Sequence, residues 1–310
     1  MTAFGLMLHH FFDDRHPMIQ GALSADQFDR MLDFLSRQHR IVDPDEWCEG
    51  TARGTLADDA LCITFDDSLR CQFDIAFPVL RDRGLKAFWF VYTSPLDGVP
   101  EKLELYRYFR NTAFDSVDAF YDAFLAQLET SEWAGEVARA RDGFDPGAYL
   151  QAFPMYTDGD RLFRFLRDKV LGGVRYDAVM ARMIEAAGLD GRAVQDLLWM
   201  DERCLRELVG AGHEIGLHSH THPLNMAELP LETQRQEFSL NRARLQAMCG
   251  CHPRSMSHPS NSYDDKTLAL LSEMGIGAGF RANMETVPYH PLTVPREDHA
   301  NVARSMSQCG

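Results

Sequence analysis

Short apolar segments alternate along the chain with segments in which apolar residues recur every three or four positions. Apolar runs of strand length followed by helical periodicity are typical of βα units around a parallel sheet. The predicted strands cover residues 5–8, 61–65, 86–92, 214–217, 255–257, 276–280 and 292–294. We therefore expect an α/β fold.

The segments between these strands predict amphipathic helices. Ser24 is a suitable N-cap, and the helix that it opens places its apolar residues on one face at Phe28, Met31, Leu32 and Leu35. Further helices are predicted over residues 75–83, 201–211, 232–248 and 264–274. Helix-terminating glycines follow at Gly84, Gly212, Gly250 and Gly275.

The middle of the chain has a different pattern. From residue 103 to residue 198 we find helical periodicity and no convincing strand. No internal repeat, low-complexity tract or long linker interrupts the sequence. We predict a single domain over residues 1–310 with a helical insertion over residues 103–198.

Composition narrows the class of protein. Lys and Arg total 31 and Asp and Glu total 46, a formal charge of -15, which argues against non-specific binding to nucleic acid or to an anionic membrane. The richest apolar run, residues 87–92, is far too short to span a membrane. The seven cysteines are scattered, and the first residues lack the basic region of a signal peptide, so we expect a cytoplasmic protein. Cys249 and Cys251 are expected to be free thiols rather than metal ligands.

Two neighbouring acids, Asp66 and Asp67, directly follow a predicted strand. An isolated pair of this kind is often an Asx turn or a helix N-cap. At a strand's end, however, the chain turns, and both carboxylates can then converge on one pocket.

Histidines occupy alternate positions in the segment His218–His222, again just after a predicted strand. Imidazole is the commonest protein ligand for zinc-like cations, and a histidine pair four positions apart can chelate from one turn of chain. With one carboxylate added, such a pair forms a three-ligand site with open positions, the catalytic pattern. The alternative interpretation is a surface loop rich in histidine.

Together, Thr64-Phe65-Asp66-Asp67 and the downstream His218-Ser219-x-x-His222 resemble the paired motifs of the polysaccharide deacetylase family, also called the NodB-homology or carbohydrate esterase family 4 group. Pro295-Arg296-Glu297-Asp298 resembles a late motif of the branch that acts in surface-polysaccharide biosynthesis, which also carries a helical insertion before the histidine motif. Weaker flanking similarities cover residues 8–11, 21–28, 77–90 and 257–263.

The resemblance implies a distorted (β/α) barrel of the NodB-homology type with its site at the C-terminal ends of the strands. It implies that Asp67, His218 and His222 bind a divalent cation, for which zinc is expected, and that Asp66 is the general base. Arg296 is expected to pair with Asp66 and keep it ionised, the alternative being a surface arginine paired with Glu297 or Asp298.

The family's usual general acid is not evident in the sequence. His9, His258 and His299 are candidates, and His9 ranks first as a pocket residue. His220 is expected to point away from the ligands and His213 to be structural. The loop of residues 257–261 and Ser68, which replaces a common glycine, depart from the family pattern; His258, Pro259 and Asp298 are the candidate substrate-binding residues.

The implied activity is hydrolytic removal of an N-acetyl group from an amino sugar carried on a nucleotide, a lipid or a glycan. One alternative is a deformylase or other amide hydrolase with the same metal site. Another is a non-catalytic sugar-binding relative, which the altered loop and Ser68 motivate. The sequence carries no prediction of oligomeric state.

Overall fold

The structure of the chain is a computed structural model that describes residues 3–151 and 156–309. The chain divides into two compact units. Residues 1–101 and 194–310 form one, here called the barrel unit, and Lys102–Ala193 form the other, here called the helical unit.

The barrel unit contains a parallel sheet with the strand order β7-β6-β5-β4-β3-β1-β8, and β2 pairs with β3. The strands are β1 Phe4–Leu8, β2 Arg40–Ile41, β3 Ala60–Phe65, β4 Phe88–Val91, β5 Glu214–Leu217, β6 Ser255–Ser257, β7 Ala278–Phe280 and β8 Arg296–Asp298. A parallel bridge between Phe280 and Val294 links the end of β7 to the segment before β8. The sheet thus nearly closes on itself, and the predicted distorted (β/α) barrel is confirmed.

A cluster of buried apolar side chains forms part of the barrel core. They come from β3, β4 and β7, from α2 (Pro44–Arg53) and from the segments after β2 and before β8, and comprise Val42, Trp47, Ala60, Cys62, Phe88, Phe90, Phe280 and Val294. Two glycines make room for large neighbours: a Cβ on Gly216 would lie 2.5 Å from the Phe90 ring, and one on Gly5 would lie 3.0 Å from Arg296 Cγ. The glycines therefore let Phe90 and Arg296 occupy the interior.

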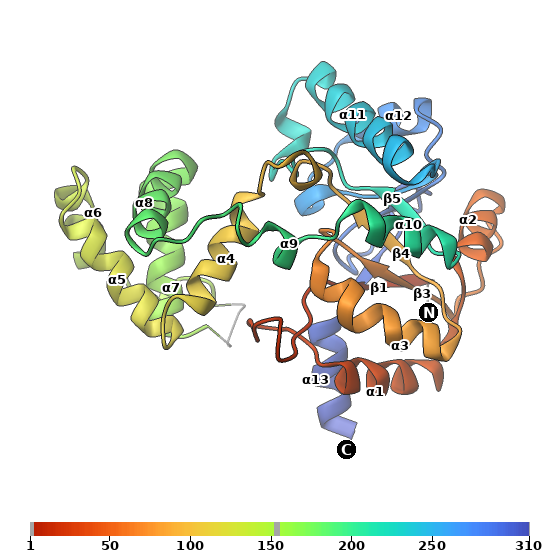
Figure 1. The fold of residues 1–310 in the computed structure, drawn as a ribbon, viewed down its shortest axis with the longest axis horizontal. Helices are drawn as coiled ribbons and strands as arrows, with labels where there is room; N and C mark the ends of the chain where they lie inside the picture. Colours follow the sequence, from red (N-terminus) through yellow and green to blue (C-terminus); the bar gives the residue numbers. More distant parts are fainter. Residues whose placement is uncertain (1–2, 152–155, 310) are drawn as a thin grey trace. The chain divides into compact units, whose positions relative to one another are not determined.

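Helices surround these strands (Figure 1). Besides α2 they are α1 Ala25–Ser36, α3 Phe77–Arg83, α9 Gln195–Leu198, α10 Glu202–Gly210, α11 Leu231–Cys249, α12 Asp265–Glu273 and α13 His299–Cys309. Ser24 and Gln27 form a capping box at the start of α1, whose predicted apolar face is buried. Helices α3 and α13 pack against α1, and α11 lies beside α12.

The helical unit consists of helices in its described residues. They are α4 Lys102–Thr112, α5 Val117–Glu129, α6 Ala134–Asp142, α7 Asp158–Phe165 and α8 Gly172–Ala186. An aromatic-rich core holds them together, with Phe109, Phe120, Phe124 and Phe163 among its buried members. The region is helical as predicted, but the compact unit ends at Ala193 and α9 belongs to the barrel unit. We keep one domain with an insertion as our interpretation of the two units.

Four elements differ from the sequence prediction. The short β2, α2 and α13 were not predicted, and the last strand is β8 rather than residues 292–294. Val294 makes only the isolated bridge. The error has a physical cause: Arg296-Glu297-Asp298 is wholly charged, so hydrophobic periodicity does not detect it, although Arg296 is buried inside the barrel.

No described helix has both the length and the apolar character needed to cross a membrane.

Candidate metal centre

Loops at the C-terminal ends of three strands carry unusual backbone conformations. Seven described residues other than glycine have positive φ, and six of them directly follow β3, β5 or β6: Asp67, Ser68, Ser219, His222, Ser260 and Asn261. Such conformations cost free energy and cluster at functional sites. Because the strands are parallel, their C-terminal ends share one edge of the sheet, and the predicted motifs converge there.

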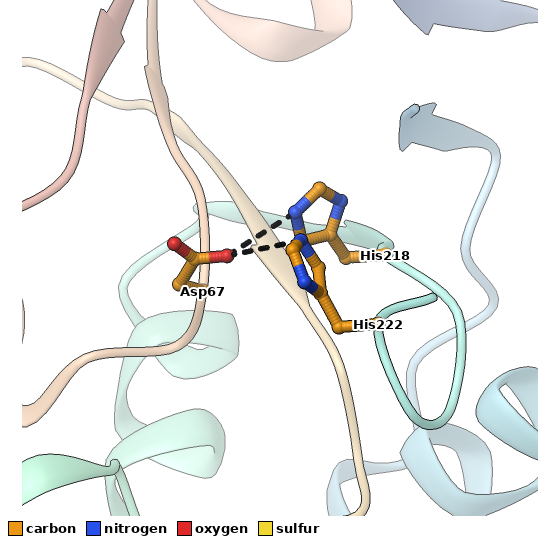
Figure 2. A group of neighbouring side chains, drawn as sticks. All are labelled: Asp67, His218 and His222. Atoms are coloured by element: carbon orange, nitrogen blue, oxygen red, sulfur yellow. Dashed lines mark ion pairs between the residues drawn. The ribbon is translucent and has the colours of Figure 1, made fainter. Parts of the chain in front are cut away.

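The three predicted metal ligands lie together (Figure 2). Asp67 Oδ1 is 3.3 Å from His218 Nε2 and 3.5 Å from His222 Nε2. One ligand atom from each residue lies within 4.8 Å of the others. Asp67 Oδ1 is buried and has no hydrogen-bond partner among the described residues. A buried carboxylate oxygen facing two imidazole nitrogens fits a divalent cation.

Hydrogen bonds set the state of His218. Its Nδ1 is 2.9 Å from the Ser257 carbonyl oxygen, so Nδ1 carries a proton and Nε2 faces Asp67. The His218 backbone N–H also donates to Asn241 Oδ1 at 3.1 Å. These contacts fix the imidazole in the orientation that a ligand needs.

The ionisation of the site suits a cation. Burial lowers the pKa of His222 to about 4, so its imidazole is neutral near pH 7. Burial alone would raise the pKa of Asp67, but His218, His222 and His9 hold that pKa well below its usual range. Burial opposes protonation of His218, yet Asp66 and Asp67 raise its pKa. The two carboxylates therefore favour the protonated form of His218 when no cation is bound.

Helix α11 anchors the loop that carries the histidines. The Glu237 carboxylate accepts hydrogen bonds from the His220 N–H at 2.9 Å, the Thr221 N–H at 2.8 Å and the Thr221 hydroxyl at 2.7 Å. Ser219 Oγ accepts the N–H of His222 at 3.1 Å. The loop's left-handed residues are thus held by specific acceptors.

Asp66 forms a buried pair with Arg296. Arg296 Nη1 and Nη2 donate to the two oxygens of Asp66 at 2.6 and 2.7 Å. Ser257 Oγ accepts from Arg296 at 2.8 Å and donates to Asp66 Oδ2 at 3.1 Å. Arg296 is 1% exposed, which excludes the alternative of a surface arginine. Burial alone would raise the pKa of Asp66, but Arg296, His218 and His9 together lower that pKa.

His9 lies beside both carboxylates. Its Nε2 is 3.9 Å from Asp66 Oδ2 and 3.9 Å from Asp67 Oδ2, and its side chain is 28% exposed. Burial lowers the pKa of His9, against the opposing effect of Asp67 and Asp66. A partly open imidazole at this place can exchange protons with a bound molecule.

The two other general-acid candidates are engaged elsewhere. His258 Nε2 is 2.7 Å from the Leu292 carbonyl oxygen, and its ring stacks on Tyr263. His299 Nε2 is 2.7 Å from the Gly21 carbonyl oxygen. Neither forms a hydrogen bond or an ion pair with Asp66 or Asp67 in the described part of the chain.

The predicted substrate-binding residues lie on two segments of the chain. His258 and Pro259 are buried at the end of β6. Asp298 is 40% exposed in its side chain, and its carboxylate accepts the Ala300 N–H at 2.7 Å at the start of α13. Contact of these three with a substrate stays a prediction.

Two further histidines behave as expected. His220 Nδ1 is 2.9 Å from Thr93 Oγ1, outside the ligand cluster. His213 is buried and its Nδ1 accepts the Ala87 N–H at 3.0 Å. Both are structural.

Sequence reasoning missed several residues that support the site. They are Gln72, Tyr92, Trp199, Ser257 and Asn241, all buried. Ser257 and Tyr92 lie at the ends of predicted strands, and Asn241 is a polar residue on the buried face of a predicted helix. Buried polar residues at such positions are the only signal that could have identified them.

The arrangement is suited to hydrolysis. A cation site with open positions beside an ionised carboxylate that is not a ligand can activate water against a carbonyl carbon.

Comparisons with known proteins found one family model that matches part of the chain. Residues 181–279 match the family model described as polysaccharide deacetylase. No curated protein matches the chain.

Several solved structures are similar in fold. The Streptococcus pyogenes deacetylase PplD in complex with acetate has 13% identity and a TM-score of 0.55, over 96% of this chain and 91% of that one. IcaB from Ammonifex degensii has 16% identity and a TM-score of 0.54, over 95% and 90%. The BpsB deacetylase domain from Bordetella bronchiseptica has 13% identity and a TM-score of 0.52, over 95% of each chain. At these identities the likeness establishes the fold.

Proposed function

We propose that this chain is a member of the polysaccharide deacetylase family, and that it is a metal-dependent hydrolase that removes an N-acetyl group from an amino sugar. The observation that carries the proposal is the placement of an arginine-paired carboxylate, Asp66, directly beside the cluster of Asp67, His218 and His222. A purely structural ion pair would not require a cluster of candidate metal ligands next to it.

In this proposal Asp67, His218 and His222 hold the cation, for which zinc suits the mixed imidazole and carboxylate ligands. When bound, such a cation supplies Lewis acidity that polarises the amide carbonyl and lowers the pKa of water.

The residues of the chain supply the proton transfers. Asp66 takes the proton of the attacking water, and Arg296 keeps this carboxylate ionised and fixes its direction through two hydrogen bonds. We assign to His9 the transfer of that proton from Asp66 to the leaving amine, because it lies 3.9 Å from Asp66 Oδ2 and is partly open to solvent.

For the substrate, we propose an amino sugar carried on a nucleotide, a lipid or a short glycan during surface-polysaccharide synthesis. The similarity in fold to two bacterial deacetylases supports an acetyl group, since one of them was solved with acetate. Cytoplasmic placement, inferred from the cysteine pattern, stays part of the proposal.

A product assay tests the activity. The zinc-loaded protein is incubated with nucleotide-linked, lipid-linked and oligosaccharide N-acetyl amino sugars and their N-formyl counterparts, and acetate, formate and free amine are quantified. We expect acetate and free amine in equal amounts, and none after chelation of the metal. Release of formate alone would identify a deformylase, and sugar binding without release would identify a non-catalytic relative.

A further inference from the structure

The two residues before the N-cap of α10, Trp199 and Met200, run antiparallel to the turn that follows the metal ligand Asp67. Leu69 and Trp199 form an antiparallel bridge. The Met200 N–H donates to the Ser68 carbonyl oxygen at 2.9 Å. We call residues 199–200 the strap.

The turn that pairs with the strap contains Asp67 and Ser68, and its backbone is strained. Asp67 has a φ of 76° and Ser68 a φ of 51°, so two successive side-chain-bearing residues adopt the left-handed region. Each such residue costs on the order of 1 kcal/mol or more, and persists only when its surroundings fix it. The strap contacts are therefore well placed to hold the Asp67 carboxylate toward the histidines.

The Trp199 side chain forms a hydrogen bond with Tyr92, whose ring lies beside the two histidines of the cluster. Its Nε1–H donates to Tyr92 Oη at 2.5 Å, and the indole is 2% exposed. The Tyr92 ring centroid lies 5.3 Å from that of His222 and 6.4 Å from that of His218. Ser68 Oγ also donates to the Tyr92 carbonyl oxygen at 3.4 Å. One tryptophan thus contacts the aspartate turn through its backbone and the histidine pair through Tyr92.

We infer that Trp199 is a positioning residue for the metal centre, which holds Asp67 and His222 at the mutual distance that a cation requires. The inference rests on the metal site of the proposed function. It assigns to Trp199 a role in metal affinity and not in the chemistry of bond cleavage.

Two variants isolate the hydrogen bond, and a third controls for loss of indole volume. Trp199→Phe removes the donor and Tyr92→Phe removes the acceptor. Trp47→Phe makes the same change at a fully buried tryptophan in the barrel core whose Nε1 has no hydrogen-bond partner among the described residues. Each metal-stripped protein is titrated with zinc chloride against a chelating competitor, and the absorption spectrum of the cobalt-loaded form reports the coordination geometry.

Outer partners that orient metal ligands typically contribute 10–100-fold in affinity. We expect Trp199→Phe and Tyr92→Phe each to weaken zinc binding by about tenfold and to alter the cobalt spectrum. The double variant should lose no more than either single variant, because both remove one hydrogen bond. Trp47→Phe should keep wild-type affinity and spectrum, even where its melting temperature falls.

Wild-type zinc affinity in both Trp199→Phe and Tyr92→Phe would overturn the inference, as would an equal loss in Trp47→Phe. Acetate release does not enter this measurement. A wild-type protein that binds zinc but releases no acetate therefore refutes the proposed function alone, whereas one that binds no zinc overturns the metal site and the role of Trp199 together.

Discussion

Replacing Arg296 with methionine removes the positive partner of a carboxylate that is 3% exposed. The variant loses both hydrogen bonds to Asp66 as well as those to Ser257 Oγ and to the Arg281 carbonyl oxygen. The methionine chain follows the aliphatic part of the arginine, so the barrel is not left with a large cavity. The change therefore measures chiefly an unpaired buried charge.

The expected size of the loss follows from the burial of the pair. Breaking a buried ion pair by removing one partner typically costs about 3–5 kcal/mol. The pKa of Asp66 should also rise in the variant, because burial raises it and Arg296 no longer lowers it. We expect the free energy of unfolding to fall by about 4 kcal/mol.

Urea denaturation of the metal-free protein, followed by tryptophan fluorescence, measures this change. Trp47, Trp89 and Trp199 lie in the barrel unit and Trp133 in the helical unit, so three of the four tryptophans report on the barrel. The midpoint should fall with little change in the denaturant slope.

Two comparisons make the measurement specific. The double variant Asp66→Leu with Arg296→Met removes both charges and should recover most of the lost stability. Arg254→Met removes an arginine that is 44% exposed and pairs with Glu214 at 3.2 Å, and should cost less than about 1 kcal/mol. A loss below about 1 kcal/mol in Arg296→Met, or no recovery in the double variant, contradicts the reasoning.

Three further outcomes are expected. Burial lowers the pKa of His213 to about 4, below the usual value of about 6.5 for an unfolded chain. The unfolded state therefore binds the proton more tightly, and stability falls as pH falls from about 6.5 toward 4. The variant His213→Asn retains an acceptor for the Ala87 N–H. In urea denaturation, its loss of unfolding free energy between pH 7 and pH 5 should be smaller than that of the wild type by about 2 kcal/mol. An unchanged pH dependence would exclude His213 as the origin of the loss. Glu237→Gln weakens the acceptor of three hydrogen bonds in the histidine loop, and should lower zinc affinity about tenfold in a chelator competition. The control Glu273→Gln, at an exposed glutamate, should keep wild-type affinity. Equal affinities in the two variants would show that the loop does not depend on Glu237. Gly216→Ala, whose Cβ would meet the Phe90 ring at 2.5 Å, should lower stability by about 1–3 kcal/mol in thermal or urea unfolding, and a wild-type midpoint would refute the packing argument.

The sequence predicts the parts of the site that depend on local pattern. Asp66, Asp67 and the histidine motif each follow an apolar segment, and parallel strands bring such positions to one edge. This pattern brings the acids and the histidine motif to one edge, and the resemblance to the deacetylase family selected Asp67, His218 and His222 as the ligands. The alternation of strands and helices indicates an α/β fold with a parallel sheet, and the barrel was implied by the same resemblance.

Other features depend on long-range pairing that no local pattern contains. Trp199 and Tyr92 are 107 positions apart, and their contact exists only because the strap pairs with the turn after β3. The strand β8 was misplaced because its buried residue is an arginine whose charge is compensated by Asp66, 230 positions away. Hydrophobic patterns cannot reveal a buried charge whose partner lies that far along the chain.

The most direct test of the central claim compares the wild-type protein with Asp66→Asn, with zinc content and acetate release measured on the same preparations. Asp66 is not among the three clustered ligands, so both proteins should bind one zinc per chain. The loss of a general base predicts that acetate release falls by at least about a hundredfold in the variant. Acetate release at the wild-type rate in Asp66→Asn, or a wild-type protein that deacetylates without metal, would contradict the account.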